Sequence, residues 1–170
     1  IKSVVLDKTG TITKGKPELT DIISFGLKEE KILMIAASLE KGSEHPLADA
    51  IVSKTIKKIT NFKAIPGHGI TAKIDKQYYF GNRKLMAKQG VKIGINDSSK
   101  LESQGKTVMY LSTGKKLLGI IAVADTIKPT SKFAISRLKK MGIKVYMLTG
   151  DAEKTAKAIA TDLDIEYFAE

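Results

Sequence analysis

The sequence contains no cysteine, which excludes disulfide bonds and thiolate metal sites and leaves the redox compartment open. It also contains no long apolar stretch. Its longest strongly apolar run, residues 117–124, is far shorter than the roughly 20 residues that span a bilayer as a helix. No apolar leader precedes the first predicted strand. We therefore expect that the chain, as given, is a soluble fragment that does not cross a membrane.

Acidic residues are scarce relative to basic ones: 29 Lys and Arg against 18 Asp and Glu give a formal charge of +11 at pH 7. Such a surplus suits an anionic partner, for example nucleic acid, a nucleotide or an anionic lipid surface. The lysines occur in ones and twos without interleaved aromatic residues, and no nucleic-acid-binding motif is present. This spread is typical of solvated helix faces. We expect no nucleic-acid partner, and of these anions only a nucleotide fits the motifs.

With 170 residues, 42% of them hydrophobic, the chain can bury a core in one domain or in two small ones. Its first 124 residues predict a mixture of strands and helices. In order, these are a strand at 1–6, a flexible basic turn at 14–17, a weak strand at 19–25, a helix from 28 to 41, a helix after Pro46, strands around a glycine-rich turn within 61–80, short helices from 81 and 97, and a hairpin of strands at 107–112 and 117–124.

The remaining residues alternate between helix and strand. The pattern predicts a helix with Ala134, Leu138 and Met141 on its apolar face, then a buried strand at 143–148. Another helix over 156–163 and a strand at 165–168 follow. A strand, helix, strand, helix, strand order is typical of a right-handed parallel α/β unit.

The first predicted strand ends at a carboxylate, Asp7, and leads into a polar loop broken by Gly10. In an open α/β sheet, ligands bind in the crevice at the carboxyl ends of the strands. Asp7 there could attack phosphorus and form an aspartyl phosphate. The alternative is an ordinary strand-end Asp that caps a turn, which is the commoner role for an isolated Asp-x-Thr-Gly string.

Residues 7–13 read Asp-Lys-Thr-Gly-Thr-Ile-Thr and resemble the phosphorylation signature of P-type ATPases, cation pumps that trap an acyl phosphate during transport. The resemblance implies that Asp7 is the nucleophile and that Lys8 supplies a nearby positive charge. It also implies that Asp7 and the backbone carbonyl of Thr9 bind Mg²⁺, which prefers oxygen ligands. Related phosphatases carry a general acid/base Asp where Thr9 stands, so rapid hydrolysis of the acyl phosphate is not expected.

A second predicted strand end carries Thr149, Gly150 and Asp151 immediately before a helix. A helix N-terminus offers N–H donors and a positive dipole to a phosphate, while the plainer role for Asp151 is a helix N-cap. The string is similar to the Thr-Gly-Asp motif of P-type ATPases. In the wider haloacid-dehalogenase-like superfamily, the threonine hydroxyl at this place holds phosphoryl oxygens. The similarity therefore implies phosphate contacts at Thr149 and Gly150 and places Asp151 in the catalytic set.

Residues 43–47, Ser-Glu-His-Pro-Leu, are similar to the His-Pro motif of the heavy-metal branch of these pumps. An isolated His before a helix-starting Pro more often caps or packs, although an imidazole can also stack on adenine. Gly-x-Gly at 67–69 and Gly-Asn at 81–82 resemble two further motifs of that branch, and each alone is also typical of a tight turn. Together the motifs imply a nucleotide-binding set of Glu40, His45, Gly67, Gly69, Ile70, Gly81 and Asn82.

The resemblance implies an α/β fold with two domains. A haloacid-dehalogenase-like phosphorylation domain with a Rossmann-like parallel sheet is expected at 1–20 and 117–170. An inserted α+β nucleotide-binding domain with an antiparallel sheet is expected at 21–116. Residues 125–129 resemble the second hinge between the two. We expect the phosphorylation domain to be truncated, because the family's Gly-Asp-Gly-x-x-Asn-Asp cluster does not occur in this chain.

The implied function is that of an ATP-binding catalytic fragment of a heavy-metal pump, with ATP and Mg²⁺ as cofactors. Residues 67–69 and 81–86 look closer to copper pumps than to zinc or cadmium pumps. The expected partners are ATP and the membrane and actuator domains of the same parent, at the cytoplasmic face of a membrane, with the transported metal ion bound elsewhere. The fragment alone is expected to be nearly inactive. A phosphatase of the same superfamily and a non-catalytic nucleotide-binding module are the alternatives.

Overall fold

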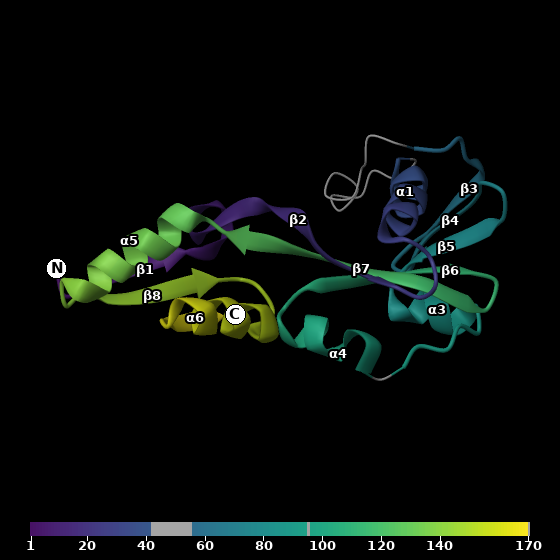
Figure 1. The fold of residues 1–170 in the computed structure, drawn as a ribbon. Coiled ribbons are helices and arrows are strands. Elements are labelled where there is room, and N and C mark those ends of the chain that lie inside the picture. The colour runs from purple at the N-terminus through teal and green to yellow at the C-terminus, as the bar shows by residue number, and fades with distance from the viewer. Residues whose placement is uncertain (42–55, 95, 170) are drawn as a thin grey trace. The chain divides into compact units, whose positions relative to one another are not determined.

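The computed structural model describes residues 1–41, 56–94 and 96–169, and the chain folds as two compact units (Figure 1). Unit 1 comprises Ile1–Glu18, Leu101–Lys106 and Ala124–Glu170, and unit 2 comprises Leu19–Lys100 and Thr107–Val123. Compared with the expected domains, residues 19–20, 101–106 and 117–123 fall in the other unit. The assignment of phosphorylation and nucleotide-binding roles to the expected ranges stays a prediction.

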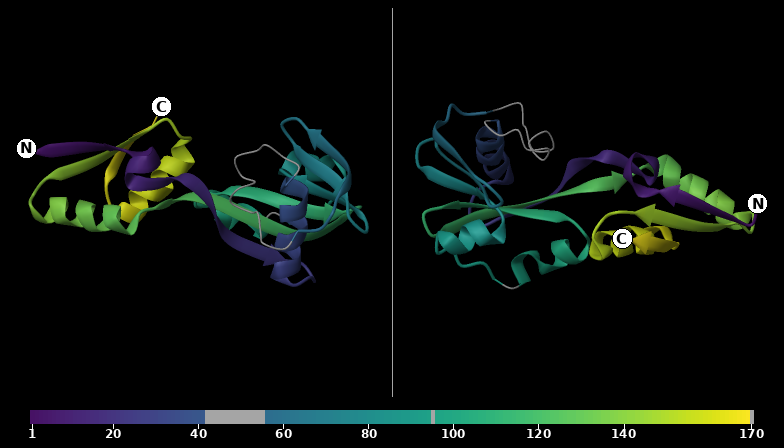
Figure 2. Two further views of the ribbon diagram at one scale, coloured as in Figure 1. Left: turned by 90° about the horizontal axis from the view of Figure 1, so that it is seen from above. Right: turned by 180° about the vertical axis from the view of Figure 1, so that it is seen from behind.

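Unit 1 contains a three-stranded parallel sheet in the order β1 (Ser3–Asp7), β8 (Lys144–Thr149), β9 (Glu166–Ala169). Helix α5 (Pro129–Lys140) leads into β8, and α6 (Glu153–Leu163) connects β8 to β9 (Figure 2). The predicted α/β alternation is therefore confirmed. It places the carboxyl ends of β1 and β8 side by side, because Asp7 pairs with Leu148.

One face of this sheet packs on both helices. Val145, Met147 and Thr149 are buried on that face, whereas Leu148 on the other face is 47% exposed. The strand predicted at 143–148 is present as β8, but the prediction that it is buried holds for one face only. Successive side chains of a strand point to opposite faces, and the described residues cover only one of them. Val5 and Phe168, on the neighbouring strands, are 56% and 55% exposed on the uncovered face.

Helix α5 packs through a different stripe from the one predicted. Ile135 is 2% exposed in the core of unit 1, and Leu138 packs against the same core. The predicted core residue Met141 is instead 70% exposed, and Ala134 is also exposed. The reason is that the helix ends at Lys140, with Met141 as its C-cap, and turns Ile135 and Leu138 toward the sheet.

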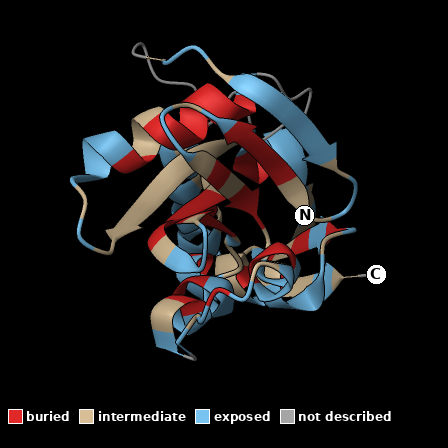
Figure 3. Ribbon diagram, turned by 90° about the vertical axis from the view of Figure 1, so that its right-hand side faces the viewer, coloured by how far each residue is buried: buried red, intermediate tan, exposed pale blue. Residues whose placement is uncertain are grey.

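A six-stranded sheet has the order β2 (Thr13–Ser24), β7 (Lys116–Ile127), β6 (Thr107–Thr113), β5 (Gln77–Gly81), β4 (Gly69–Lys73), β3 (Thr60–Ile65). The pairs from β3 to β7 are antiparallel, as expected for the insert. Within unit 2, α1 (Glu29–Glu40) buries the predicted face of Ile32, Ile35, Ala36 and Leu39 in the core (Figure 3). Two shorter helices are α3 (Arg83–Lys88) and α4 (Asn96–Ser103).

Residues 14–17, predicted as a flexible turn, instead form part of β2. The Gly15 N–H donates to the Asp125 carboxylate at 2.9 Å, and Lys14 pairs with Glu18 at 2.8 Å. The hydrogen bond from Lys14, together with one from Thr126, lowers the pKa of Glu18. Proline is tolerated here because β2 lies at the sheet edge, where one side of the strand needs no ladder donor. These contacts explain why a basic, glycine-containing segment is extended.

None of the helices in the described ranges is long and apolar enough to cross a membrane. The helix predicted after Pro46 lies outside the described residues, as does His45.

Candidate phosphorylation and nucleotide sites

Asp7 is the last residue of β1 and is exposed, so its carboxylate is accessible to a phosphate. The chain then makes a tight loop over residues 8–12. Thr9 has φ −76° and ψ 118°, which breaks the helical turn, and Gly10 has φ +76°. A positive φ of this size favours glycine because a Cβ would be strained there. Gly10 is therefore the residue that lets the loop turn immediately after Asp7.

Lys8 is held between two carboxylates. It is only 5% exposed, and its ammonium group forms an ion pair with Asp151 and lies 3.8 Å from the carboxylate of Asp125. A buried ammonium is costly unless it is paired. The pairing therefore fixes the Lys8 side chain beside the Asp7 loop and joins residues that are far apart in the sequence.

Asp125 has a structural role that the sequence analysis did not find. One of its carboxylate oxygens accepts the Gly15 N–H at 2.9 Å, and the other lies 2.5 Å from the Thr13 hydroxyl and near Lys8. The segment containing Asp125 was noted only for its likeness to a hinge. The sequence signal for such a role was an acidic residue, Asp125, directly after a long apolar run. Its partner Lys8 is more than 100 residues away, so the sequence did not connect the two.

The start of α5 holds the carbonyl groups of the Asp7 loop. The Lys128 N–H donates to the Ile12 carbonyl at 3.0 Å, and the Lys128 ammonium group donates to the Gly10 carbonyl. The Ser131 hydroxyl donates to the Thr11 carbonyl at 3.2 Å. The sequence analysis also missed Lys128 and Ser131, because nothing in their local pattern indicates which loop the helix start contacts.

The second predicted motif lies at the end of the neighbouring strand. Thr149 ends β8 and is 5% exposed, and its hydroxyl accepts the Asp151 N–H at 3.1 Å. Gly150 is exposed, with open space where a Cβ would lie. The N-cap of α6 is Ala152 and has no side-chain cap, so Asp151 pairs with Lys8 instead of capping the helix. The structure thus brings the two motifs together through Lys8 and Asp151.

The oxygen donors beside Asp7 suit a hard cation. The described residues contain no group of three or more His, Cys, Asp or Glu that could enclose a metal. Mg²⁺, however, usually keeps several waters and takes one or two protein carboxylates together with phosphate oxygens. An accessible Asp7 carboxylate next to the Thr9 backbone therefore fits Mg²⁺.

Gly69 and Gly81 are opposite each other on β4 and β5. A Cβ on Gly69 would lie 2.3 Å from the Phe80 carbonyl oxygen, and one on Gly81 would lie 2.2 Å from the His68 carbonyl oxygen. These distances are far below van der Waals contact. Both glycines are therefore required by the close approach of the two backbones, whatever ligand lies near them.

Asn82 joins the Gly67 turn to α3. Its side-chain oxygen accepts the Leu85 N–H at 3.1 Å, which caps the helix, and its side-chain nitrogen donates to the Gly67 carbonyl at 2.8 Å. Its own N–H donates to the His68 carbonyl at 2.9 Å. Residues 67–69 and 81–82 are thus one structural unit, although they are 12 or more residues apart in the sequence.

The other expected nucleotide-binding residues are less exposed. Ile70 is 5% exposed and belongs to the same core cluster as Leu39 of α1. Glu40, the next residue and the last of α1, is also 5% exposed. The end of α1 and the start of β4 therefore both border the core of unit 2. A nucleotide-binding role for Glu40, Gly67, Gly69, Ile70, Gly81 and Asn82 stays a prediction.

The family model described as "Hydrolase: haloacid dehalogenase-like hydrolase" matches residues 1–170. The chain belongs to the haloacid dehalogenase-like hydrolases. Within this family, it is 47% identical over 175 residues to a copper-exporting P-type ATPase of Bacillus subtilis (strain 168), covering 97% of this chain and 22% of that relative. The haloacid-dehalogenase-like fold and the resemblance of the chain to P-type ATPases are thereby confirmed. The chain spans about a fifth of the length of the curated relatives that it matches.

Two solved structures resemble the chain over 99% of its length. A zinc-transporting PIB-type ATPase in an E2.Pi state is 35% identical with a TM-score of 0.87, and the match covers 29% of that chain. The catalytic domain of a CPx-ATPase, CopB-B, which was solved to follow conformational changes upon nucleotide binding, is 27% identical with a TM-score of 0.67, and the match covers 62% of it. The sequence is therefore homologous to the catalytic region of metal-transporting P-type ATPases.

Proposed function

We propose that this chain is the ATP-binding catalytic part of a heavy-metal P-type ATPase of the copper-exporting type, in which Asp7 is transiently phosphorylated. The observation that carries the proposal is the junction of two strand ends, where the exposed Asp7 and the Thr149–Asp151 turn are joined through Lys8. The 47% identity to a copper-exporting relative supports copper over zinc, since the zinc-transporting structure is 35% identical.

Phosphoryl transfer requires mainly positioning and charge neutralisation. An Asp7 oxygen would attack the γ-phosphorus of ATP, the bond between that phosphorus and the bridging oxygen would break, and ADP would leave with the electron pair. The Thr149 hydroxyl and the Gly150 backbone would contact the phosphoryl oxygens. The N-terminus of α6, which has no side-chain cap, supports this assignment because its N–H donors and dipole favour an anion.

Lys8 would act through its fixed position rather than as a proton donor. Its pairing with Asp151 and Asp125 keeps the ammonium group beside the loop and limits its freedom to bind Asp7 instead. Mg²⁺ held by the Asp7 carboxylate and the Thr9 carbonyl would supply charge neutralisation. Together these groups supply the positive charge that a transferring phosphoryl group requires.

We assign ATP binding to the insert, residues 21–116, and phosphorylation to residues 1–20 and 117–170. Glu40, His45, Gly67, Gly69, Ile70, Gly81 and Asn82 would line the nucleotide site. The turn at Gly67 supports this, because open space lies where its Cβ would be and bare backbone allows close approach of a flat ligand. The membrane and actuator domains would belong to the same longer protein, and the metal ion is cargo that binds elsewhere.

The superfamily also contains phosphatases, and Thr9 separates the two activities. A carboxylate two residues after the nucleophile can polarise the water that hydrolyses the acyl phosphate, whereas a threonine hydroxyl has a pKa too high to act as that base. We therefore infer a long-lived aspartyl phosphate. Because the chain spans about a fifth of its relatives, transport is a property of the longer protein.

The nucleotide half of the proposal is tested by calorimetric titration of the 170-residue chain with ATP. Binding should be measurable, and His45→Ala should weaken it by roughly 1–2 kcal/mol if one stacking or hydrogen-bonding contact is lost. Unchanged affinity in that variant would remove His45 from the site. The chain alone should show ATPase activity near background, because the family's Gly-Asp-Gly cluster is outside it.

The phosphorylation half is tested in a version extended to the length of the relatives. Radiolabelled ATP should leave acid-stable, hydroxylamine-sensitive label on wild-type protein and none on Asp7→Asn, whereas the surface variant Asp162→Asn should label normally. Thr9→Asp should shorten the lifetime of the label. Steady cleavage of generic phosphate esters without label would show a phosphatase instead.

A further inference from the structure

The outer face of α5 takes no part in the proposed phosphorylation site. Phe133, Arg137 and Met141 recur every four residues and therefore lie along one side of the helix, with Lys140 beside them. Phe133 is 66% exposed and Met141 is 70% exposed. Large apolar side chains grouped on an exposed surface mark an interaction site more often than an inert one.

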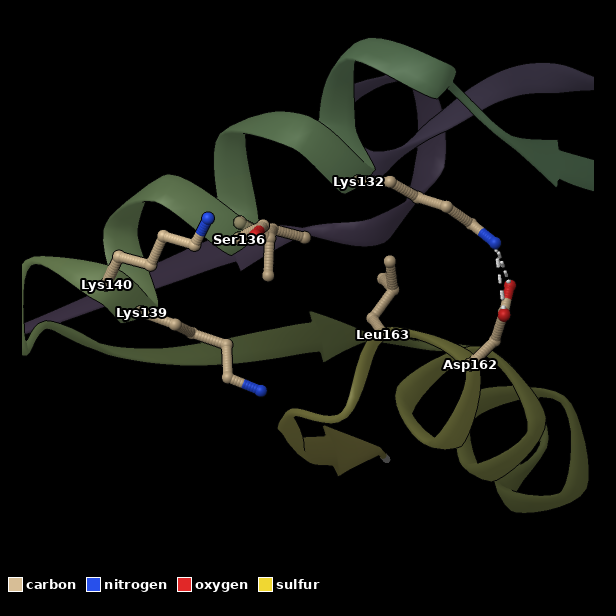
Figure 4. A pocket seen from close by; sticks show the side chains of 7 residues that line it. Lys132, Ser136, Lys139, Lys140, Asp162 and Leu163 are labelled. Carbon is tan, nitrogen blue, oxygen red and sulfur yellow. Dashed lines mark hydrogen bonds and ion pairs between the residues drawn. The ribbon is translucent and has the colours of Figure 1, made fainter.

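The charge of α5 is entirely positive. The helix contains four basic residues, Lys132, Arg137, Lys139 and Lys140, and no acidic residue. Lys132 pairs with Asp162 at 2.8 Å, and Lys139 pairs with Asp164 at the end of α6. Lys132, Lys139 and Lys140 line a pocket of about 470 Å³ together with Asp162 and Leu163 of α6, and Figure 4 shows the Lys132–Asp162 pair there.

Arg137 and Lys140 differ from these two lysines. Among the described residues, neither forms an ion pair, and the Arg137 guanidinium group lies over the Phe133 ring at 5.9 Å from its centroid. The outer face therefore combines two exposed cations with two exposed apolar side chains. No acidic residue of the helix offsets them.

Further positive charge lies at the same end of unit 1. The N–H of Lys144 donates to the carbonyl of Lys2 at 3.1 Å, and both residues are exposed. Lys144 is three residues after Met141, so the C-terminus of α5 is close to the starts of β1 and β8, but the Lys144 side chain lines a pocket with Lys139, Asp164 and Glu166 and is not on the outer face of α5. The nearby acids are Asp164, which is already paired with Lys139, and Glu166 on β9.

We propose that this surface, Phe133, Arg137, Lys140, Met141 and Lys2, binds the anionic headgroup surface of a phospholipid bilayer. Arg137 and Lys140 would contact lipid phosphates while the Phe133 and Met141 side chains enter the interface. An acidic protein would match the charge, and Phe, Met and Arg are enriched in the cores of protein–protein interfaces. Two of the three cations are lysines, however, which are depleted there. Basic residues mixed with exposed Phe on one helix are typical of binding to anionic bilayers. The proposal concerns a surface separate from Asp7 and does not depend on nucleotide binding.

A tryptophan probe tests whether the surface enters a bilayer. The chain has no tryptophan, so Phe133→Trp introduces a single fluorophore at the proposed site. Its emission should shift to the blue with vesicles containing phosphatidylglycerol and stay unchanged with pure phosphatidylcholine vesicles. Phe62→Trp, on β3 at a position 37% exposed, is the matched control and should not respond. A shift in the control of the same size, or no shift at position 133, would overturn the proposal.

Charge removal tests the cations. Each basic residue at an anionic membrane surface contributes about fivefold to the binding constant, so Arg137→Gln/Lys140→Gln should weaken vesicle binding by about 25-fold. Lys84→Gln/Lys88→Gln, an exposed pair on α3, makes the same change in net charge and should bind vesicles within about twofold of wild type. If net charge alone governed binding, both double variants would be weakened alike. Equal loss in both pairs would show non-specific attraction.

Binding to soluble poly-glutamate tests whether the surface binds an acidic protein instead of a bilayer. Wild-type protein should bind anionic vesicles more tightly than poly-glutamate. The double variant Arg137→Gln/Lys140→Gln should lose no more poly-glutamate affinity than the Lys84→Gln/Lys88→Gln control. Binding of poly-glutamate that depends on Arg137 and Lys140, without vesicle binding that depends on them, would assign the surface to an acidic protein and overturn the proposal. Circular dichroism of each variant shows that the fold is retained.

Discussion

Substitution of Asn82 tests whether the Gly-x-Gly and Gly-Asn segments contribute to stability, to ATP binding or to both. Its side chain makes two internal hydrogen bonds, one that caps α3 at Leu85 and one that holds the Gly67 carbonyl. Asn82→Ala removes both. Loss of a helix N-cap costs about 1 kcal/mol, and loss of a hydrogen bond to a turn costs about another 1 kcal/mol. We expect a free energy of unfolding lower by roughly 2 kcal/mol.

Asn82→Asp separates the two contacts. An aspartate still caps the helix and gains slightly from the helix dipole, but it cannot donate to the Gly67 carbonyl. This variant should lose about 1 kcal/mol or less of stability. Its affinity for ATP should fall if the Gly67 turn forms part of the nucleotide site, because the turn would no longer be held in place.

Urea unfolding followed by circular dichroism gives the two free energies, and calorimetric titration gives the ATP affinity. Asn96→Ala, at an exposed residue of α4 outside these contacts, serves as the matched asparagine control for binding. If Asn82→Ala and Asn82→Asp are both as stable as wild type, the internal hydrogen bonds do not have the energetic role assigned to them. If both lose stability but bind ATP normally, Asn82 is purely structural.

Three further changes test other parts of the structure. Gly81→Ala should lower the free energy of unfolding by more than 3 kcal/mol, because its Cβ would overlap the His68 carbonyl oxygen; a thermal melt within 2 °C of wild type would contradict this. Burial and the hydrogen bond to Asp75 raise the pKa of Tyr78 to about 12. Because the folded state favours the neutral phenol, its contribution to the free energy of unfolding is complete below about pH 10 and falls by roughly 2 kcal/mol as the pH rises to about 12. Tyr78→Phe should abolish this pH dependence, whereas Tyr79→Phe should retain it. Asp125→Asn should destabilise the chain by about 1–3 kcal/mol in chemical unfolding at pH 7, because Lys8 keeps only Asp151 as its anion, and an unchanged midpoint would show that Asp125 is dispensable.

The sequence by itself determined the types of most elements and predicted the chemistry of the Asp7 loop. Apolar periodicity located α1 and its buried face, and glycine located the loop after β1, because these signals are local. The likeness of residues 7–13 to the P-type signature indicated the family that the comparisons then showed. The order of the motifs along the chain predicted which segments share a site, although it gave no contacts.

Only the tertiary structure decided which groups hold that loop and which faces are covered. Asp125, Lys128 and Ser131 contact the Asp7 loop across more than 100 residues of sequence, and no local pattern encodes such contacts. The exposure of Met141 and Leu148 likewise depends on where the helices pack and not on how apolar the residues are. Residues 14–17 form a strand because the Asp125 carboxylate accepts the Gly15 N–H and because the segment lies at the edge of the sheet. Partners that are distant in sequence can therefore override a local turn signal.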